Sequence, residues 1–447
     1  MRQQRRKRIV WIILAIIIAA LLLTGLLYNR PLPVREWVGK GVTPSPTPTQ
    51  PASPTPTPAP TPSHMPPPTY TPSPPPTYTP SPSPKPVIPT PQPAMTFEDV
   101  DFVGADRYSS LTDLRASFLD ARAKLMAQVA FRLDKAITLD DFTSALAVFD
   151  GSIEYAYGTM SGSDDLCVLV SFRYTPGTRI AHAYKTGQYD ILSDAESRVL
   201  NAALECLQTL GSEELWPEHP LLIERKIHDY LCANMRYFDD KTNNSGTALR
   251  DYQTAIGAFD DKRGNCMAYA DAFLMLARMA GFECDTIIGE AKNENGEWIG
   301  HAWNMIRIDE QWLMCDVTYD DLDSPPFTRG YAYFNIDELT IKPDHRWAPE
   351  AMYRPVASES SERYGFGNSE FPDLKTATSE SGFRTNLESA LSAAYTRDAW
   401  FMLEGFSVTI ERIQEWMQDW DWSKPGGWLM IHQELGANQY WTFHIMD

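Results

Sequence analysis

Three residues in the middle of the chain have the side chains that a cysteine acyl-transfer site needs. Cys266 stands at the expected start of a helix, His301 opens an apolar run typical of a strand, and Asp316 lies near the end of another such run. A thiol attacks a carbonyl only after losing its proton, which a neighbouring imidazole can accept while a carboxylate orients that imidazole. The residue types and their order therefore predict a nucleophile, a base and an orienting group, without identifying a substrate.

The helix that carries Cys266 is expected to have one buried face. Apolar side chains recur after the cysteine at helical spacing, at Ala270, Phe273, Leu274 and Ala277. Backbone N–H groups are free at a helix start and the dipole is positive there, so a thiol next to an imidazolium has its pKa lowered from about 8.5. We also expect the N–H of Cys266 to help stabilise an oxyanion.

Two antiparallel strands, 302–308 and 311–317, are expected to position the other two residues. If residues 309–310 form a two-residue turn, His301 and Asp316 point to the same face of the hairpin. Diagonal neighbours of this kind have Cα atoms about 7–8 Å apart, which permits an imidazole–carboxylate hydrogen bond. A register shifted by one residue would put Asp316 on the opposite face, and the triad would not form.

Each of these three residues alone has an ordinary structural explanation. A cysteine at a helix start is usually a small core residue, a histidine before a strand is usually structural, and an aspartate late in a strand often begins a turn. Their joint occurrence in this order favours a site. Four more residues are predicted to contact the substrate or to supply a second oxyanion donor: Asn265, Tyr269, Trp303 and Tyr237.

The composition excludes some partners. Residues 1–95 have nine Lys or Arg and one Glu, a net charge of +8, and since the whole chain carries −19, residues 96–447 carry −27. So acidic a region lacks the positive surface that binds phosphates, and no nucleic-acid partner is expected. The sequence has no Asp-x-Asp-x-Asp-Gly calcium loop and no His or Cys pairs at metal-ligand spacing, so it predicts no metal and no cofactor.

The N-terminus predicts a membrane anchor. Five basic residues within 2–8 precede the uncharged apolar run 9–27, which would span about 28 Å as a helix, close to the thickness of the hydrocarbon core. The run is longer than a typical signal-peptide core and no clear cleavage site follows it. We expect residues 1–28 to be a cytoplasmic basic flank and a single-pass signal anchor in the cell membrane, with the C-terminal region extracellular. A cleaved signal peptide is the alternative, and it would also export the rest of the chain.

Residues 29–95 are expected to be an extracellular linker. Between 43 and 93 the sequence is almost wholly Pro, Thr and Ser, and the unit Pro-Pro-Pro-Thr-Tyr-Thr-Pro-Ser-Pro occurs at 66–74 and again at 74–82. Such a segment favours extended polyproline II geometry and can reach on the order of 150 Å. It would hold a folded domain away from the membrane.

Residues 96–447 are expected to fold as an α+β protein of three parts. The central domain, 191–350, carries the candidate site on a cysteine-bearing helix packed on an antiparallel sheet. Smaller α/β modules at 96–190 and 351–447 flank it, each with the order helix, strand, helix, hairpin, so the second is a candidate repeat of the first; generic α/β packing is the alternative. The expected elements are helices at 111–126, 139–149, 194–210, 222–236, 384–395 and 408–420, strands at 127–134, 284–290 and 400–403, and hairpins of 152–158 with 166–174 and of 428–433 with 440–444.

Three short segments carry a resemblance to a known family. The runs 264–269, 301–304 and 312–318 resemble the three blocks of the transglutaminase-like superfamily, the papain-like arrangement shared by transglutaminases, peptide N-glycanases and many exported bacterial proteins. Flanking segments that also resemble it are 227–237, 279–282, 334–336 and 344–345, so the likeness covers about 190–350. The resemblance implies that Cys266 is the nucleophile, His301 the general base and acid, and Asp316 the group that orients His301.

The sequence departs from that pattern at two positions beside the acyl pocket. Asn265 stands where the family usually has a small apolar residue before the cysteine, and Ala268 stands where many members have Gly. Neither change removes a catalytic group. Both bear on the choice of substrate.

Two functions from different classes fit these observations. The leading hypothesis is a membrane-anchored extracellular cysteine acyltransferase or peptidase that attacks a carboxamide or peptide carbonyl and produces either crosslinking or hydrolysis. Its substrate would be a peptide or protein, of the cell surface or cell wall by location. The alternative is a non-enzymatic cell-surface binding or scaffolding module on a transglutaminase-like fold. A papain-type protease proper fits the order and spacing of the blocks less well.

Overall fold

The computed structural model describes most of the chain from residue 95 onward. The described ranges are 95–139, 141–142, 152–159, 164–212, 219–239, 250–322, 325–347, 364–392, 398–418 and 428–445. The predicted anchor at 9–27 and the Pro-rich linker lie outside these ranges. Within them, no helix is both long enough and apolar enough to cross a bilayer.

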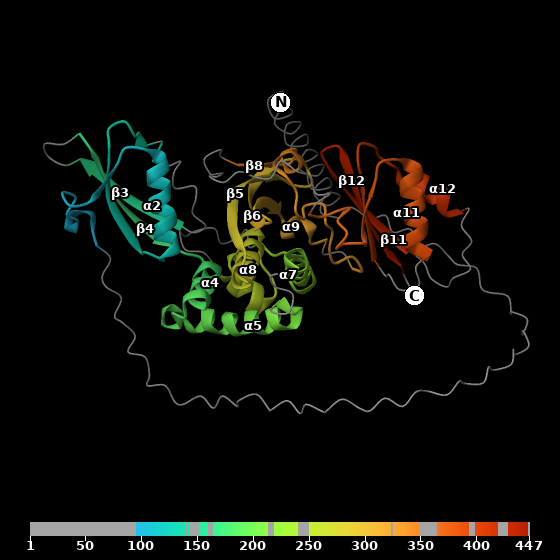
Figure 1. Ribbon diagram of the computed structural model, residues 1–447, viewed down its shortest axis with the longest axis horizontal. Helices are drawn as coiled ribbons and strands as arrows, with labels where there is room; N and C mark the ends of the chain where they lie inside the picture. The colour runs from blue at the N-terminus through green and yellow to red at the C-terminus, as the bar shows by residue number, and fades with distance from the viewer. Residues whose placement is uncertain are drawn as a thin grey trace, which may run out of the picture.

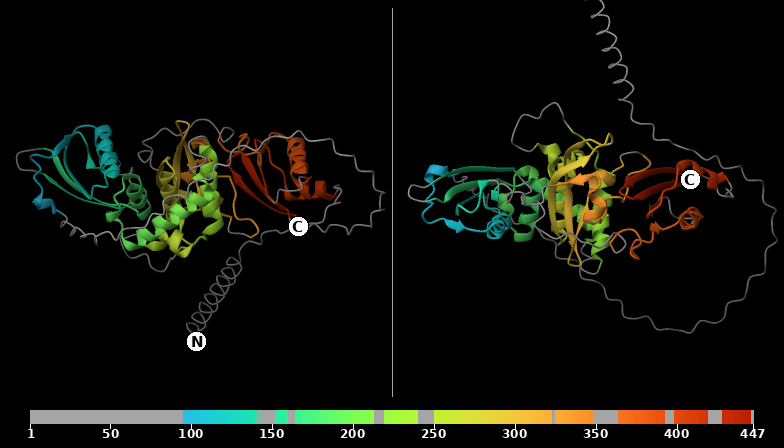
Figure 2. Two further views of the ribbon diagram at one scale, coloured as in Figure 1. Left: turned by 60° about the horizontal axis from the view of Figure 1, so that its bottom comes forward. Right: turned by 90° about the horizontal axis from the view of Figure 1, so that it is seen from above.

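The described chain forms three parts that lie in a row, each built on a four-stranded sheet (Figure 1, Figure 2). The central part lies between the two flanking parts, which are at opposite ends of the long axis of the molecule. Short turns of 3-10 helix at Phe97–Asp99, Tyr189–Ile191 and Asp251–Gln253 and a π-helical turn at Gly257–Asp261 accompany the main elements.

The first part consists of a sheet covered by a helix. Its elements are β1 (Asp106–Tyr108), α2 (Leu111–Ala123), β2 (Gln128–Leu133), β3 (Ser152–Thr159) and β4 (Leu166–Arg173). Ser110 caps α2 by accepting a hydrogen bond from a backbone N–H of its first turn, and Leu114 and Phe118, one turn apart, pack towards Phe131 of β2. The predicted hairpin is confirmed as the antiparallel pair β3–β4. The predicted helix at 139–149 falls largely outside the described residues.

The last part has the same kind of construction. Its elements are β9 (Leu374–Ala377), α11 (Glu380–Ser392), β10 (Asp398–Leu403), α12 (Ile410–Gln418), β11 (Trp428–Leu435) and β12 (Asn438–Ile445). Phe383 and Leu387 of α11 pack with Phe401 of β10 and Phe443 of β12. The predicted strand, both predicted helices and the predicted hairpin of this part are confirmed within a few residues.

The two flanking sheets share one topology. Their strand orders are β1-β2-β4-β3 and β9-β10-β12-β11. In both, the first strand in the chain is parallel to the second, the second is antiparallel to the fourth, and the fourth is antiparallel to the third. In both, a helix joins the first strand to the second. A duplicated module would have this shared topology. The sequence predicted the order helix, strand, helix, hairpin, and the structure adds one strand, β1 or β9, before the first helix of each module.

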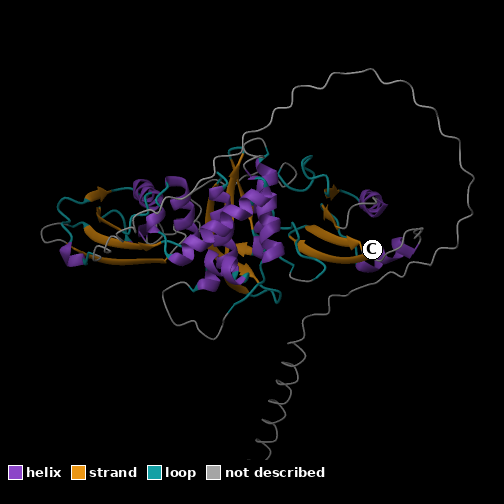
Figure 3. Ribbon diagram, turned by 90° about the horizontal axis from the view of Figure 1, so that it is seen from below, coloured by secondary structure: helices purple, strands orange, loops and turns teal. Residues whose placement is uncertain are grey.

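The central part places its helices against one antiparallel sheet. Its elements are α4 (Pro176–Thr186), α5 (Asp194–Leu210), α7 (Pro220–Asn234), α8 (Cys266–Met279), β5 (Glu283–Lys292), β6 (Trp298–Ile308), β7 (Gln311–Cys315), α9 (Val317–Asp320), α10 (Glu338–Ile341) and β8 (His345–Arg346). The strand order is β7-β6-β5-β8, with every neighbouring pair antiparallel. In Figure 3, which looks from below, the helices of this part lie in front of its strands.

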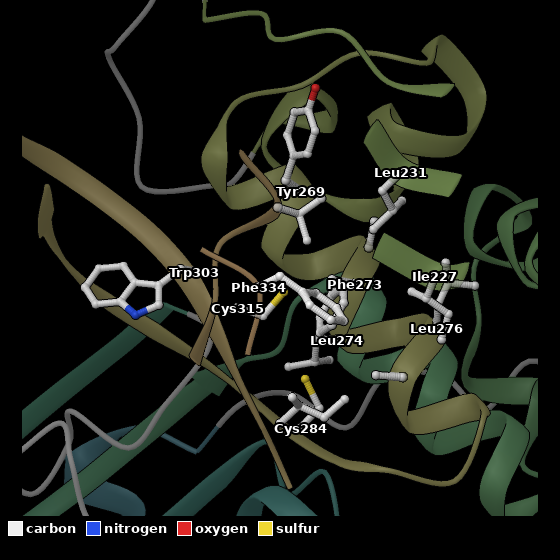
Figure 4. Packing of buried hydrophobic residues seen from close by; sticks show 14 of the residues in the cluster. Ile227, Leu231, Tyr269, Phe273, Leu274, Leu276, Cys284, Trp303, Cys315 and Phe334 are labelled. Atoms are coloured by element: carbon white, nitrogen blue, oxygen red, sulfur yellow. The ribbon is translucent and has the colours of Figure 1, made fainter. Parts of the chain in front are cut away.

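Helix α8 is enclosed on more than the one face that its sequence predicted. Twelve of its 14 residues are buried. Helices α4 and α7 and strands β5 and β6 all pack against it. In Figure 4, Phe273 and Leu274 of α8 lie on one side of the central strands and Trp303 of β6 lies on the other. The nucleophile therefore starts a helix that is itself the centre of the core.

Helix α4 was not predicted, and its packing places it with the central part. The N–H of Gly177 donates to Asp271 Oδ2 of α8 at 3.0 Å. A Cβ on Gly177 would lie 2.4 Å from Asp271, so the close approach of α4 to α8 requires glycine at this position. By packing, the central part begins near residue 175, whereas the sequence placed the boundary at 190.

The C-terminal part shares one hydrophobic core with the central part. Leu374, Trp400 and Met402 belong to the same buried cluster as Leu274 of α8 and Phe334. The first part instead has separate clusters of its own. A cleft of about 600 Å³ lies between α2, α4 and the start of β5, where Arg122 of α2 forms an ion pair with Asp285 of β5 at 2.9 Å. The two flanking modules are thus attached to the centre in different ways.

One contact of the C-terminal part reaches the segment next to the candidate site. Gln433 Nε2, on β11, donates to the carbonyl oxygen of Tyr319 in α9 at 3.0 Å. A Cβ on Gly330 would lie 2.5 Å from Gln433 Oε1, so the loop opposite β11 also approaches this side chain closely. The last sheet therefore supports α9 directly.

Replacing Glu224 with glutamine is expected to remove a pH dependence of stability. Glu224 of α7 has no exposed surface and accepts a hydrogen bond from Asn335 Nδ2 at 2.7 Å. Burial raises the pKa of Glu224 from 4.5 to about 8, so the native state keeps a proton that the unfolded chain releases. Stability should therefore fall as pH rises from about 4.5 to 8, by up to roughly 5 kcal/mol. Melting temperatures between pH 5 and 8 should vary less in Glu224→Gln, and equal slopes in the two proteins would contradict this explanation.

Candidate active site

Cys266 is the first residue of α8, as predicted. Asn265 caps the helix, because its Oδ1 accepts the backbone N–H two residues further on at 3.1 Å. A backbone bridge between Tyr237 and Gly264 holds the segment that leads to the cysteine. A Cβ on Gly264 would lie 2.3 Å from that of Ala268, so the tight entry into the helix requires glycine. The thiol is thereby fixed at the helix start, with 8% of the residue exposed.

His301 and Asp316 are joined by a hydrogen bond. The turn at 309–310 has positive φ at both positions, 47° and 67°, as in a two-residue type I′ hairpin, and gives the predicted register between β6 and β7. Asp316 follows β7, and its Oδ2 lies 2.6 Å from His301 Nε2. Cys266 contributes to the raised pKa of His301, so the thiol lies beside the imidazole, whose Nδ1 is the nitrogen not bonded to Asp316. Sulfur, imidazole and carboxylate therefore lie next to one another in that order.

Asp316 is held by every hydrogen bond that its two oxygens can be expected to accept. It is the N-cap of α9, where Oδ1 accepts from the N–H groups of Thr318 at 3.0 Å and Tyr319 at 3.2 Å. Oδ2 accepts from His301 and from a second histidine, His345, at 3.0 Å. Burial alone would raise the pKa of Asp316, but the two histidines hold it well below its usual range. The carboxyl group is therefore ionised and fixed.

The electrostatics of His301 favour its protonated form. Burial alone would lower the pKa of His301, but the charge of Asp316 and the hydrogen bonds to Asp316 and Cys266 raise it to about 10. An imidazolium next to Cys266 at neutral pH is the partner that a thiolate nucleophile needs. The N–H of Cys266 forms no backbone hydrogen bond among the described residues, so it is free to bind an oxyanion.

The four residues predicted to contact the substrate have different positions. Tyr237 is 49% exposed, and besides its burial the charge of Cys266 raises its pKa, so it lies at the surface near the sulfur. Asn265 uses its amide oxygen as the helix cap, which leaves Nδ2 as its donor. Tyr269 is a correction: it is 1% exposed and its hydroxyl donates to Asp321, so it is a core residue and not a substrate contact. Trp303 is also buried, with its ring stacked 5.9 Å from that of His301, so it supports the histidine instead.

Residues that the sequence analysis gave no role surround the triad. His345 Nδ1 lies 2.7 Å from Asp344 Oδ1, and the hydroxyl of Tyr333 donates to the other oxygen of Asp344 at 2.6 Å. The ring of Tyr319 lies 4.6 Å from that of His301. The pair at 344–345 had been noted only for its resemblance to the family, and no spacing rule connects it to Asp316.

A second set of the same three residue types lies deeper in the central part. Cys232 Sγ is 3.9 Å from His228 Nε2, which is 3.3 Å from Asp320 Oδ2. All three are buried, and burial raises the pKa of Cys232 to about 11. A thiol that holds its proton and has no access to solvent does not attack a carbonyl. Residue types alone therefore do not distinguish the candidate site from a packed cluster.

The donor atoms of His301, Asp316 and His345 lie within 4.8 Å of one another, so their fit to a metal ion can be tested. The two histidine nitrogens are 2.6 Å and 3.0 Å from the same carboxylate oxygen. These are hydrogen-bond lengths, whereas two ligands around a tetrahedral zinc ion are about 3.3 Å apart. The geometry favours protons between these atoms, and the donors do not fit a bound metal.

Metal chelation is accordingly expected to leave the reactivity of Cys266 unchanged. The three donors are already occupied by hydrogen bonds to one another. The rate of iodoacetamide labelling at Cys266 should be the same, within about a factor of two, with and without EDTA. Loss of labelling or a lower melting temperature after chelation would show that a metal holds the site together.

Comparison with known proteins gives a family for the central part. Residues 212–317 match the model of the transglutaminase-like superfamily. No curated protein matches the sequence. Among solved structures, the crystal structure of a TGase is 12% identical with a TM-score of 0.24, covering 48% of this chain and 59% of that chain. The periplasmic domain of TgpA from Pseudomonas aeruginosa is 19% identical with a TM-score of 0.21, covering 34% of this chain and 54% of that chain.

The chain thus spans little more than half the length of either of these two structures. The segment matched by the family model contains the helix-borne cysteine, the histidine on β6 and the aspartate that follows β7. The predicted α+β core, with a cysteine-bearing helix on an antiparallel sheet, is the fold of this segment. Residues 212–317 of this chain therefore form a domain of the transglutaminase-like superfamily, as the sequence predicted.

Proposed function

We propose that the protein is a membrane-anchored extracellular enzyme that transfers acyl groups from peptide or carboxamide substrates through Cys266, His301 and Asp316. The observation that carries this proposal is the hydrogen bond between the imidazole of His301 and the ionised carboxylate of Asp316, beside a cysteine at a helix start. A buried imidazole kept protonated by a carboxylate is the group that activates a cysteine. The family of the central part supports the same class of reaction.

The geometry supports a two-step reaction. The thiolate of Cys266 attacks the carbonyl carbon, and the electron pair of the C=O bond moves to the oxygen, which the free N–H of Cys266 can bind. His301 gives its Nδ1 proton to the nitrogen as the C–N bond breaks, so an amine or ammonia leaves and a thioester remains. Water or a second amine then gives a proton to His301 and attacks the thioester, and the C–S bond breaks. Water yields hydrolysis, and an amine yields a crosslink.

The test of this proposal separates reactivity from turnover. Residues 95–447 would be labelled with iodoacetamide between pH 5 and 8, and each modified cysteine located by mass spectrometry. The protein would then be incubated with a glutamine-containing peptide and hydroxylamine, and released ammonia and hydroxamate measured, with Cys266→Ala as the blank. Activity that disappears in Cys266→Ala supports the enzyme. Unlabelled Cys266 and no product with any peptide would favour the alternative, a binding module that keeps the residues of a triad.

The proposed location rests on the sequence of residues 1–28. The full-length chain should stay with the membrane fraction after carbonate extraction, and protease added to intact cells should remove its C-terminal region. Release by carbonate would contradict an anchor. Resistance of the C-terminal region to protease would contradict its exposure outside the cell.

A further inference from the structure

Both ring nitrogens of His345 face carboxylate oxygens. Nε2 is 3.0 Å from Asp316 Oδ2 and Nδ1 is 2.7 Å from Asp344 Oδ1. The side chain of His345 has no exposed surface. A carboxylate can only accept hydrogen bonds, so two contacts of this length require a hydrogen on each nitrogen. The ring is then an imidazolium.

The groups around the ring are consistent with a cation at this position. Its titratable or charged neighbours come from several elements, and they are Asp316, Asp344, His301, Tyr319 and Tyr333. Burial raises the pKa of both tyrosines, so they are neutral. The fixed charges near His345 are therefore two carboxylates and the imidazolium of His301.

The backbone leaves His345 little freedom to adopt another arrangement. β8 pairs with β5, which places His345 opposite Ala291. Lys292 N donates to the carbonyl oxygen of Asp344 at 2.8 Å, so both residues of the pair are anchored to β5. The rings of Trp303 and Tyr319 lie 4.9 Å and 5.1 Å from that of His345. The ring is thus packed in place before any substrate binds.

We propose that His345 is a positioning residue of the site, a buried cation that holds the Asp316 carboxylate in line with His301 and shares its negative charge. Asp316 Oδ2 accepts from His301 and from His345 at the same time. Without the second donor, the oxygen would be held only by the ring that must exchange protons during the reaction. With it, the carboxylate stays in place when His301 loses its proton.

His345 also tunes the acid strength of His301. Its ring lies 5.5 Å from that of His301, so its positive charge opposes a second positive charge there. The positive charge of His345 also offsets part of the negative charge of Asp316, so Asp316 raises the pKa of His301 less than it would alone. A proton is consequently easier to remove from His301 than it would be with Asp316 alone, which suits a group that must give up that proton to a leaving amine.

The inference rests on the proposed use of the triad, but its first test does not require turnover. In protein labelled with ¹⁵N-histidine, both ring nitrogens of His345 should show the chemical shift of a protonated nitrogen from pH 5 to pH 8, assigned by comparison with His345→Gln. One protonated and one bare nitrogen in that range would overturn the proposal. This result is independent of whether any peptide is a substrate.

The second test is the pH profile of labelling at Cys266 with iodoacetate, an anion that the imidazolium of His301 attracts, so the rate rises as the thiolate forms and falls when His301 loses its proton. Glutamine at position 345 can still donate to Asp316 but carries no charge, so removing the cation should move both limbs of the profile to higher pH. The acidic limb should rise by about half a unit to one unit, and the alkaline limb above its wild-type position. A lower plateau with unmoved limbs would show that His345 is merely structural. Phenylalanine at 345, which cannot donate, should lower the plateau by about tenfold or more beyond glutamine.

His228 provides a matched control. Its nitrogens lie 3.1 Å from Asp229 Oδ1 and 3.3 Å from Asp320 Oδ2, so it has the same kind of environment without touching the triad. His228→Gln should lower the melting temperature and leave the pH of both limbs unchanged. If His228→Gln and His345→Gln shift the limbs alike, the proposal fails. If labelling follows these expectations but no peptide is turned over, the positioning role stands and the proposed function fails.

Discussion

Replacing His301 with alanine is expected to reduce acyl transfer by about 10³- to 10⁴-fold. His301 is the group in contact with both Cys266 and Asp316, and its raised pKa of about 10 keeps it protonated beside the sulfur. Without it, nothing accepts or returns the proton in either step. Labelling of Cys266 should also become that of an ordinary thiol, falling about tenfold per pH unit below pH 8. In the native protein, where His301 keeps its proton up to a pH of about 10, the rate should depend less on pH than in the variant.

A control must distinguish the effect of losing the imidazole from the effect of a destabilised fold. His301→Gln keeps most of the buried volume but cannot exchange a proton, so it should have the same labelling profile as His301→Ala and a melting temperature closer to that of the native protein. The six cysteines are all buried and free, so labelling of Cys232 or Cys206 reports on unfolding within the same sample. If His301→Ala keeps the native labelling profile while Cys232 stays unlabelled, the triad does not activate Cys266.

Ending the chain after residue 347 is expected to unfold the central part, although the family match ends at 317. Leu374, Trp400, Leu435 and Tyr440 belong to the same buried cluster as α8, and removing them would expose much of that cluster to water. At about 1.5–3 kcal/mol for each buried side chain, the loss is comparable to the roughly 5–15 kcal/mol that usually stabilises a domain. The truncated protein should show no cooperative thermal transition, and all of its cysteines should react with iodoacetamide.

Two further variants of this chain serve as controls for the truncation. Trp400→Ala removes one buried ring from the shared core and should destabilise the protein by about 3–5 kcal/mol, measured by urea unfolding. Deletion of 95–173 removes the first part but leaves α4, and it should lower the melting temperature only modestly, because that part has separate hydrophobic clusters. A well-folded chain ending at 347 would show that the C-terminal part is dispensable for the fold.

The sequence predicted those features of the site that depend on neighbours in the chain. The two-residue turn at 309–310 and the alternation of a strand were sufficient to place His301 and Asp316 on one face, and the structure has that register. Gly264 and Asn265 likewise marked the start of α8. Each of these is a local property, because a turn, a cap or a strand period acts within a few residues.

What the sequence could not predict depends on contacts between distant segments. His345 reaches Asp316 only because β8 pairs with β5, and nothing in the intervening residues indicates that pairing. Tyr269 was misjudged for the opposite reason: it is three residues from Cys266 but points into the core, so proximity in sequence did not mean access to the site. Trp303 failed as a substrate contact in the same way.

The contact between Gln433 and the backbone of Tyr319 has a consequence for the time at which the site forms. A chain is made from its N-terminus, so Cys266 is synthesised well before the strand that supports α9. Asp316 caps α9, and the last sheet bonds to that helix, so the full support of the carboxylate is in place only after residue 433 has been made and docked. During synthesis, the triad would therefore reach its final geometry long after its nucleophile has been made.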